Sequence, residues 1–484
     1  MQSTNPDYYW NQRSFSHTNP EYRTSAFKKA FITACIDTAT IINHANDEIN
    51  DDAVDSDNID NFIEHTGVDD VLPDECPSGD SSNSFQSKKK IQMFRDIFSD
   101  NYNNIVSWNL RPSTLDNIQR MLSCGDPSLG GIMFGCPNCQ QSLHFSPFHC
   151  GSRFCPSCGY KYNMLRANAM MSKLIDAPHR HVTFTIPEEL RFFFRLDRNA
   201  LNDLFTAVAD TLTYVALNSS ASLHFQPGFI SVLHTFGRDL KWNPHVHVLL
   251  CETLLGDNKA SRNFFLPYPL LRKSFRKCLL DRLSARFGKV FSKLINLIYK
   301  AHPNGFYVHA PKQNVNTQAL IKYIGRYLGR PPIASSRIDS YDGTSVTFHY
   351  NSHEDNKLVY STLPAGDFIQ ALIVHIPDKN FKMVRYYGFY SSEGARTASL
   401  KSHTLKTKVT SSQKKQALQN LKWRQSLIHC FNSDPLECPY CGATMEPIYF
   451  NCKGRTWFYP GRSMPDAVDI RYRAMMKTFN RSSA

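Results

Sequence analysis

The chain of 484 residues carries 55 Lys and Arg against 42 Asp and Glu, which gives a net charge of +13 and a pI near 9.0. At roughly 150 residues per domain, this length predicts about three domains, and 42% hydrophobic against 20% charged residues excludes a fibrous or mainly disordered protein. The sequence contains neither the run of roughly 18 apolar residues that a membrane helix needs nor the P-loop motif of many ATPases, so we expect no membrane partner and no use of ATP.

The charge is distributed unevenly along the chain. Between Asp37 and Asp80 there are 14 acidic residues and no Lys or Arg, and leaving these out raises the net charge of the remaining chain from +13 to +27. An excess of this size indicates a polyanionic partner, of which nucleic acid is the usual one. Residues 1–90 lack the apolar core of a signal peptide, so we expect an acidic, largely disordered extension of a cytoplasmic protein, with one short helix near Ala26–Ala39.

Regular elements are predicted from Ile91 onward. Apolar residues at helical spacing predict helices over 91–108 and 112–122, and Pro178 marks a change to strands. Two of these strands are joined by the turn-rich segment GRDLKWNP and are expected to form a hairpin. Because strands and helices mix without a strict βαβ repeat, we predict an α+β fold with an antiparallel sheet. The other predicted elements are helices at 161–177, 198–217, 267–301 (two) and 316–330, and strands at 181–187, 229–236, 245–251, 306–311, 345–350, 357–362 and 383–390.

Ten of the 14 cysteines lie in two groups that contain C-x-x-C pairs. In a reducing compartment such pairs indicate metal binding rather than disulfides. Two pairs are separated by 15 residues, and two such pairs can supply the closed four-sulfur shell that structural Zn²⁺ prefers. The sequence therefore predicts one structural zinc site formed by Cys136, Cys139, Cys155 and Cys158.

Other donors surround both cysteine groups. Within the first group, Cys124 and Cys150 are possible extra zinc ligands, and His144 and His149 are surplus donors that could replace a ligand or form a second site. Near the C-terminus, Cys438 and Cys441 form a further C-x-x-C pair. A tetrahedral site there would need two more donors, for which the candidates are Cys430, Cys452 and His429.

Two pairs of residues carry the chemistry of a nuclease. His245 and His247 are two positions apart on a predicted strand, so both imidazoles leave one face and could hold a divalent metal. Tyr323 and Tyr327 are four positions apart on a predicted helix and also share a face. When a metal polarises a phosphodiester, a nearby phenol can attack the phosphorus and cleave the DNA, forming a covalent phosphotyrosine. A parallel basic stripe beside the tyrosines could bind phosphate, and consists of Lys322, Arg326 and Arg330.

Each pair has a rival in the same sequence. His179 and His181 enclose an arginine at the entrance of a strand, whereas HVH lies within an apolar run. Tyr386 and Tyr390 flank a glycine in a predicted strand, so they would not share a helical face. A third metal ligand remains open between His234, on the partner strand of the hairpin, and Gln318, before the tyrosine helix.

The order of these motifs resembles the insertion sequence 91 family of bacterial transposases. The resemblance covers roughly residues 100–450 and depends on the segments CPNC, SRFCPSCG, HVTFTIPEEL, LHTFGRDLKWNPHVHVLL, YIGRYLGRPPIA, HIPDKNFKMVRYYGFY and DPLECPYCGATM. These transposases are two-tyrosine rolling-circle enzymes of the HUH endonuclease superfamily. The acidic extension lies outside the resemblance, and Phe154 departs from it at a position where relatives commonly have His.

The resemblance implies an HUH-type antiparallel sheet with flanking helices, preceded by a small zinc-binding domain. It implies that His245 and His247 bind catalytic Mg²⁺ or Mn²⁺, that Tyr323 and Tyr327 are the nucleophiles, and that single-stranded element ends and target DNA are the substrates. The activity would be rolling-circle transposition through 5′-phosphotyrosine intermediates, at the bacterial nucleoid. The alternatives are a relaxase or replication initiator, or a non-catalytic zinc-dependent DNA-binding regulator.

Together, composition and resemblance divide the chain into four parts. An acidic extension (1–90) precedes a helical, zinc-binding DNA-recognition domain (91–176) and an HUH two-tyrosine catalytic domain (177–395). The last part (396–484) combines a basic linker with the C-terminal C-x-x-C region, since 394–433 contains eight Lys or Arg and no acidic residue. The oligomeric state is not predicted.

Overall fold

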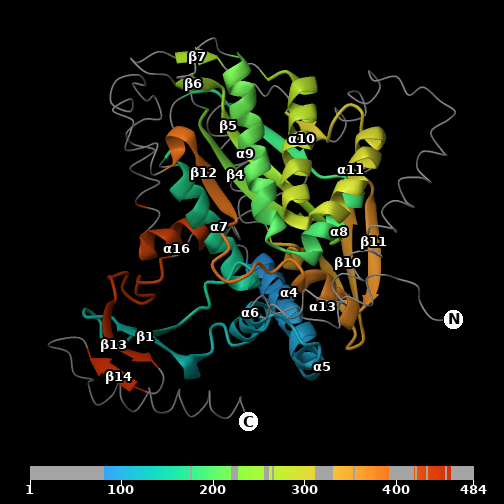
Figure 1. Cartoon of the computed structure of the whole chain (residues 1–484). Coiled ribbons are helices and arrows are strands. Elements are labelled where there is room, and N and C mark those ends of the chain that lie inside the picture. The colour runs from blue at the N-terminus through green and yellow to red at the C-terminus, as the bar shows by residue number, and fades with distance from the viewer. Residues whose placement is uncertain are drawn as a thin grey trace.

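The computed structural model confirms the α+β class, with helices packed on antiparallel sheets (Figure 1). It describes residues 81–391 except 172, 175–176, 220–226, 256–260, 264–265, 311–330 and 353–354, followed by 419, 422–431, 434–452 and 455–458. The helices expected near Ala26–Ala39 and over 316–330 lie outside these residues. Among the described helices none is both long and apolar enough to cross a membrane.

A five-stranded antiparallel sheet forms the centre of the molecule. Its strand order is β12 (Val384–Tyr387), β4 (Phe229–Phe236), β5 (Trp242–Cys251), β3 (His179–Thr185) and β8 (Val308–His309). The hairpin expected from GRDLKWNP is confirmed as β4 and β5. Beyond the end of β5, the short strands β6 (Thr253–Leu255) and β7 (Ser261–Asn263) pair with each other.

One face of this sheet is covered by helices (Figure 1). Val246, Val248 and Leu250 alternate along β5 and belong, with Leu233 of β4, to a large buried apolar core. This burial of one face explains why the strands are apolar at every second position. The helices that complete the core are α8 (Glu188–Leu196), α9 (Ala200–Ser219), α10 (Tyr268–Phe287) and α11 (Lys289–Ala301).

The opposite face of the sheet carries histidines at one end and packs against α7 (Pro156–Met171) at the other. Ala167 and Met170 of this helix contact Ile230, Val232 and Leu249 in a small buried cluster. The first turn of α7 contains Cys158. One continuous helix therefore joins the first cysteine group to the central sheet.

A second core joins the N-terminal helices to a later part of the chain. It buries Phe94, Phe98 and Ile118 together with Phe348 and Phe368. Its members come from both sides of residue 176, so the N-terminal helices and these later elements bury their side chains in one core. Its elements are α4 (Ser81–Asp100), α5 (Tyr102–Ser107), α6 (Pro112–Leu122), η4 (Ser335–Arg337), β9 (Ile338–Tyr341), β10 (Ser345–Asn351), β11 (Leu358–Pro364) and α13 (Ala365–Ile373).

A four-stranded sheet combines strands from the two ends of the described chain (Figure 1). Its order is β14 (Arg455–Phe458), β13 (Glu446–Cys452), β1 (Gly130–Gly135) and β2 (Leu143–Pro147). The pair Cys438 and Cys441, in the last expected part of the chain (396–484), is therefore brought to the same sheet as Cys136 and Cys139. The short helices η2 (Pro127–Leu129) and α16 (Trp423–Phe431) lead into this sheet from either side.

Edge strand β12 is held beside β4 by a close backbone approach at Gly388, in the turn η5 (Gly388–Tyr390). Gly388 has a φ of +56°, and a Cβ there would lie 1.8 Å from the carbonyl oxygen of Pro227. The backbone conformation disfavours other residues at this position, and a Cβ would collide with this carbonyl group.

We expect Gly388→Ala to destabilise the protein by the roughly 1–2 kcal/mol of a positive φ plus about 1–3 kcal/mol of overpacking. Thermal unfolding followed by circular dichroism measures the effect. Gly343→Ala is the matched control, because Gly343 has a φ of +93° but a Cβ added there would meet no atom within 4 Å. Equal losses in the two variants would contradict the role of the backbone approach.

Candidate functional site

Three histidines meet on the α7-facing side of the central sheet, within the described residues. His234 of β4 lies directly opposite His245 of β5, and His247 follows two positions later on the same face. The ring centroid of His234 lies 5.5 Å from that of His245 and 4.7 Å from that of His247, and the latter two are 4.8 Å apart. One ring nitrogen from each lies within 4.8 Å of the others. Such a group can hold one divalent cation with coordination positions left over.

The strand register changes next to this group. His234 pairs with His245, but Phe236 pairs with Trp242, so β5 contains an extra residue just before His245. Pro244 lies in this stretch and cannot donate a ladder hydrogen bond, which explains why the irregularity forms there. Bulges of this kind turn side chains next to functional sites.

Hydrogen bonds fix the orientation of the two strand β5 imidazoles. Nδ1 of His245 lies 2.7 Å from the carbonyl oxygen of Asn243, to which it donates, and this makes Nε2 the nitrogen that could bind a metal. Nδ1 of His247 lies 2.9 Å from Nε2 of His181 and 3.3 Å from Oγ1 of Thr183. These contacts have the form of the outer partners that orient metal-binding histidines.

His181 is an unexpected member of the site. Burial, together with the nearby charges of His309 and His245, lowers the pKa of His181 to about 3, so the ring is neutral at neutral pH. A neutral imidazole has one donor and one acceptor, and can therefore support a single tautomer of His247. In the sequence, the HRH segment stands out only as a rival metal motif. The alternation of side chains in a strand places His181 on the same face of β3 as Thr183. Thr183 pairs with His247, so this pattern was the signal that could have identified His181.

Of the two candidates for a third ligand, the structure brings His234 into the group. Gln318 lies outside the described residues, as do Tyr323, Tyr327, Lys322, Arg326 and Arg330. The chain on either side of that segment is described, as His309 before it and Ile333 after it. His309 of β8 pairs with Thr183, and Ile333 packs in the same core as Leu240, in the turn between β4 and β5.

The rival tyrosine pair does not occupy a helical face. Tyr386 lies in β12, under the ammonium group of Lys173 at 4.1 Å from the ring centroid. Tyr390 lies in η5, and its hydroxyl is 2.6 Å from Nε2 of His179. The prediction that this segment is a strand is confirmed for its first half, and both tyrosines pack within the fold.

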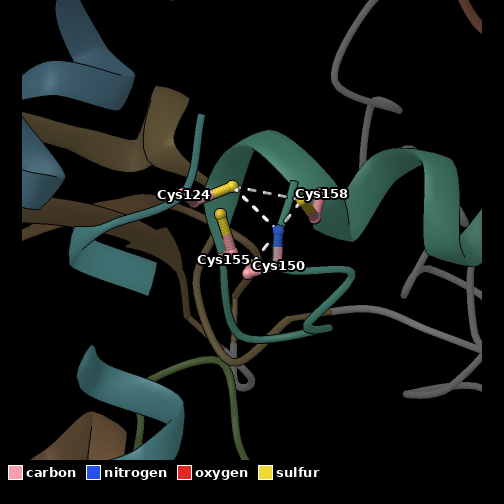
Figure 2. A group of neighbouring side chains, drawn as sticks. All are labelled: Cys124, Cys150, Cys155 and Cys158. Atoms are coloured by element: carbon pink, nitrogen blue, oxygen red, sulfur yellow. Dashed lines mark hydrogen bonds between the residues drawn. The ribbon is translucent and has the colours of Figure 1, made fainter. Parts of the chain in front are cut away.

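Eight of the ten cysteines whose side chains the structure describes form two groups of four, where the first C-x-x-C pairs predicted one site. The first consists of Cys124, Cys150, Cys155 and Cys158, whose side chains point toward one another (Figure 2). Sγ of Cys158 lies 3.5 Å from Sγ of Cys124 and 3.7 Å from that of Cys150. The backbone N–H of Cys150 donates to Sγ of Cys124 at 3.3 Å. Donation of this kind stabilises a thiolate, which is the form that binds Zn²⁺.

The second group consists of Cys136, Cys139, Cys438 and Cys441. The prediction that Cys136 and Cys139 share a site with Cys155 and Cys158 is therefore wrong, because the pairing of β1 with β13 carries the first pair to the C-terminal pair. Cys124 and Cys150, which the sequence suggests as extra ligands, instead complete the group of Cys155 and Cys158. His144 and His149 are exposed and belong to neither group. The side chains of Cys430, Cys452 and His429 lie outside the described residues.

Within the cysteine groups the pKa values of the thiols move in opposite directions, and the hydrogen bond with Cys124 raises the pKa of Cys150 and of Cys158. Hydrogen bonding from Cys150 lowers the pKa of Cys124 to about 7, and a hydrogen bond from the backbone N–H of Ala443 lowers the pKa of Cys441 to about 6. Four closely spaced thiols cannot all ionise without a cation between them, and Zn²⁺ supplies that charge.

Phe154, the departure from the family pattern, is a core residue. Its ring meets those of Phe94 and Phe98 edge-on, at centroid distances of 5.9 and 5.5 Å. Cys155 is fully buried in the same core. The first cysteine group is complete without a ligand at position 154.

Two sequence families match the regions that carry these groups. The family described as "Transposase zinc-binding domain" matches residues 95–186, and the family described as "Putative transposase" matches residues 228–398. The chain is also 29% identical over 355 residues to the transposase for insertion sequence element IS801 of Pseudomonas savastanoi pv. phaseolicola, covering 69% of this chain and 83% of that protein. The chain belongs to the insertion sequence 91 family of transposases.

A second relative of this insertion sequence 91 family transposase is "Putative transposase y4qJ" of Sinorhizobium fredii. It is 26% identical over 291 residues, covering 55% of this chain and 71% of that protein. No solved structure matches the chain. The transposase family match includes the three histidines and the tyrosine segment, and the zinc-binding match includes the whole first cysteine group. The protein is thus an enzyme that acts on DNA, with a zinc-binding domain toward its N-terminus.

Removing zinc from the transposase should loosen the core around the first cysteine group, because Cys124, Cys155 and Cys158 are buried among the rings of the second core. We expect chelation to lower the melting temperature by roughly 10 °C, since each kcal/mol corresponds to about 2–4 °C in a domain of this size. Differential scanning fluorimetry with and without a membrane-impermeant chelator measures the shift. Restoration by Zn²⁺ but not Mg²⁺ is the control, and an unchanged melting temperature of the metal-free chain would contradict a structural role.

Proposed function

We propose that this transposase nicks and rejoins single-stranded DNA at the ends of its mobile element through 5′-phosphotyrosine intermediates, in the manner of rolling-circle transposition. The observation that carries the proposal is the group of three imidazoles on the central sheet. Further support comes from Tyr323 and Tyr327, which lie within the region matched by the transposase family together with the three histidines. The reaction belongs at the bacterial nucleoid, where its DNA is located.

In the proposed reaction, the phenol oxygen of Tyr323 or Tyr327 attacks the phosphorus. A bond from this oxygen to phosphorus forms, and the bond from phosphorus to the 3′ oxygen breaks. The phenol loses its proton, and the leaving 3′ oxygen takes up a proton to become a hydroxyl. The tyrosine keeps the 5′ phosphate. Because the phosphodiester energy is stored in this linkage, rejoining is the reverse attack by a 3′ hydroxyl and needs no ATP. Two tyrosines allow two strand ends to be held at once.

The three imidazoles fit a divalent metal. Mg²⁺ or Mn²⁺ bound there would polarise the scissile phosphate as a Lewis acid. Three nitrogen donors leave coordination positions for phosphate oxygens, and nitrogen ligands favour Mn²⁺ over Mg²⁺. His181 and Thr183 act on His247 and are positioning residues. Lys322, Arg326 and Arg330 would hold the flanking phosphates, consistent with the basic excess of the chain outside its acidic stretch.

Metal binding can be tested without measuring DNA cleavage. We expect His181→Ala to weaken Mn²⁺ binding by about 10–100-fold, as loss of an outer partner does, and His234→Ala to weaken it at least as much, because a direct ligand is lost. Isothermal titration calorimetry with the zinc-loaded protein measures both affinities.

His144→Ala is the matched control for these variants, because His144 is an exposed histidine outside all three metal-ligand groups. It should bind Mn²⁺ as the wild type does. Unchanged affinity in His234→Ala would remove this residue from the site, and unchanged affinity in His181→Ala would refute its positioning role.

The covalent step can be tested with labelled single-stranded element ends and Mn²⁺, followed by denaturing electrophoresis. A 3′ label should move to the mass of the protein, because tyrosine keeps the 5′ phosphate of the downstream segment, whereas a 5′ label should leave on a shorter strand. Tyr323→Phe/Tyr327→Phe should reduce this adduct roughly 10⁴-fold or more, while DNA binding in a gel-shift assay is retained.

Tyr386→Phe is the control for the tyrosine variant, since Tyr386 packs on the sheet under Lys173. It should form the adduct normally. A wild-type protein that binds both element ends but never becomes labelled would favour the zinc-dependent regulator instead, and an adduct that survives in the double variant would assign the nucleophile elsewhere.

A further inference from the structure

The second cysteine group joins segments that are about 300 residues apart in the sequence. Cys136 directly follows β1, and Cys441 lies shortly before β13. Gly135, the last residue of β1, pairs with Glu446, the first residue of β13. The antiparallel pairing of these two strands therefore brings both C-x-x-C turns to the same end of the sheet.

The two turns have the same local geometry. Both have the sequence Cys-Pro-x-Cys, and each is followed by a residue with positive φ, at +56° for Gln140 and +70° for Gly442. The N–H of that residue donates to the carbonyl oxygen of the first cysteine, at 3.2 Å in the first turn and 2.9 Å in the second. This tight turn directs both thiols to one side, as the cysteine pairs of zinc sites require.

The four sulfur atoms face one another across the two turns. Sγ of Cys136 lies 3.4 Å from that of Cys441, and Sγ of Cys139 lies 3.6 Å from that of Cys438. Both distances are well above the roughly 2.05 Å of a disulfide bond, and these four are free thiols. A tetrahedral ion surrounded by four thiolates matches this arrangement.

We propose that Cys136, Cys139, Cys438 and Cys441 bind a second structural Zn²⁺, separate from the ion of the first cysteine group. The two groups share no residue, and each alone completes a four-sulfur shell. Neither matched family region contains Cys438 and Cys441, since the matches cover 95–186 and 228–398. The zinc-binding unit of this transposase is thus completed by its C-terminal segment.

This second ion would stabilise the contact between the C-terminal segment and the body of the protein. Closing a loop of this length by a metal gives a large gain relative to the unfolded chain. Next to the ion, the ring of Phe134 stacks on that of Trp423 in α16 at a centroid distance of 6.0 Å. In turn, α16 packs against α7 (Figure 1). Met170 of α7 packs on the central sheet. The second zinc site is therefore connected by direct packing to the sheet that carries the histidines.

Counting thiolate-bound metal tests the proposal. The full chain is produced in cobalt-supplemented minimal medium with His245→Ala/His247→Ala, so that the histidine group contributes no metal. Cobalt content and the sulfur-to-cobalt charge-transfer absorption are then measured per chain. We expect two thiolate-bound ions, one in Cys438→Ser/Cys441→Ser, and one in Cys124→Ser/Cys150→Ser. Cys278→Ser, which changes a half-buried cysteine of α10, should retain two.

One thiolate-bound ion in the chain with all its cysteines would overturn the proposal, and so would two ions in Cys438→Ser/Cys441→Ser. The count in the chain with all its cysteines needs no serine variant. A count of one ion there overturns the second site even where a serine variant fails to fold. Because no DNA is used, the outcome is independent of the proposed phosphotyrosine chemistry.

Discussion

The pairing of β4 with β5 that sets His234 opposite His245 is the constraint on which the rest of the structure depends. Side chains alternate between the two faces, so a slip of β5 by one residue would move His245 and His247 into the apolar core, away from His234. Burial of each large aliphatic side chain contributes about 1.5–3 kcal/mol, and Val246 and Val248 would lose this in the slipped register. The hydrophobic face of the hairpin therefore fixes the positions of the three imidazoles on the other face.

Helix α7 connects the first cysteine group to this sheet. α7 begins within the first cysteine group and ends on the sheet face that carries the histidines, where Met170 is almost fully buried. A change in the cysteine-rich part that tilts α7 would therefore reach Val232 and Leu249, which lie next to the histidines on the same strands. Because packed interiors deform little, a displacement of α7 would be passed on to the strands that carry the histidines.

Much of the fold could be predicted from the sequence, because its main elements have strong local patterns. The hairpin, the helix at Pro112–Leu122 and the shared face of His245 and His247 follow from periodicity and turn residues alone. The partners of Cys136 and Cys139 could not be predicted, since spacing identifies a C-x-x-C pair but not the second pair that joins it. That choice depends on the pairing of β1 and β13, and β1 is a short, glycine-rich strand with little alternation.

The most direct test of the central claim is to locate the metal in crystals of the full transposase soaked in Mn²⁺. Anomalous difference maps recorded on either side of the manganese absorption edge separate this ion from zinc at the cysteine groups. We expect one manganese peak surrounded by Nε2 of His245, Nε2 of His247 and a ring nitrogen of His234. A manganese peak elsewhere on the chain, with none between these three rings, would contradict the claim that the hairpin forms the catalytic metal site.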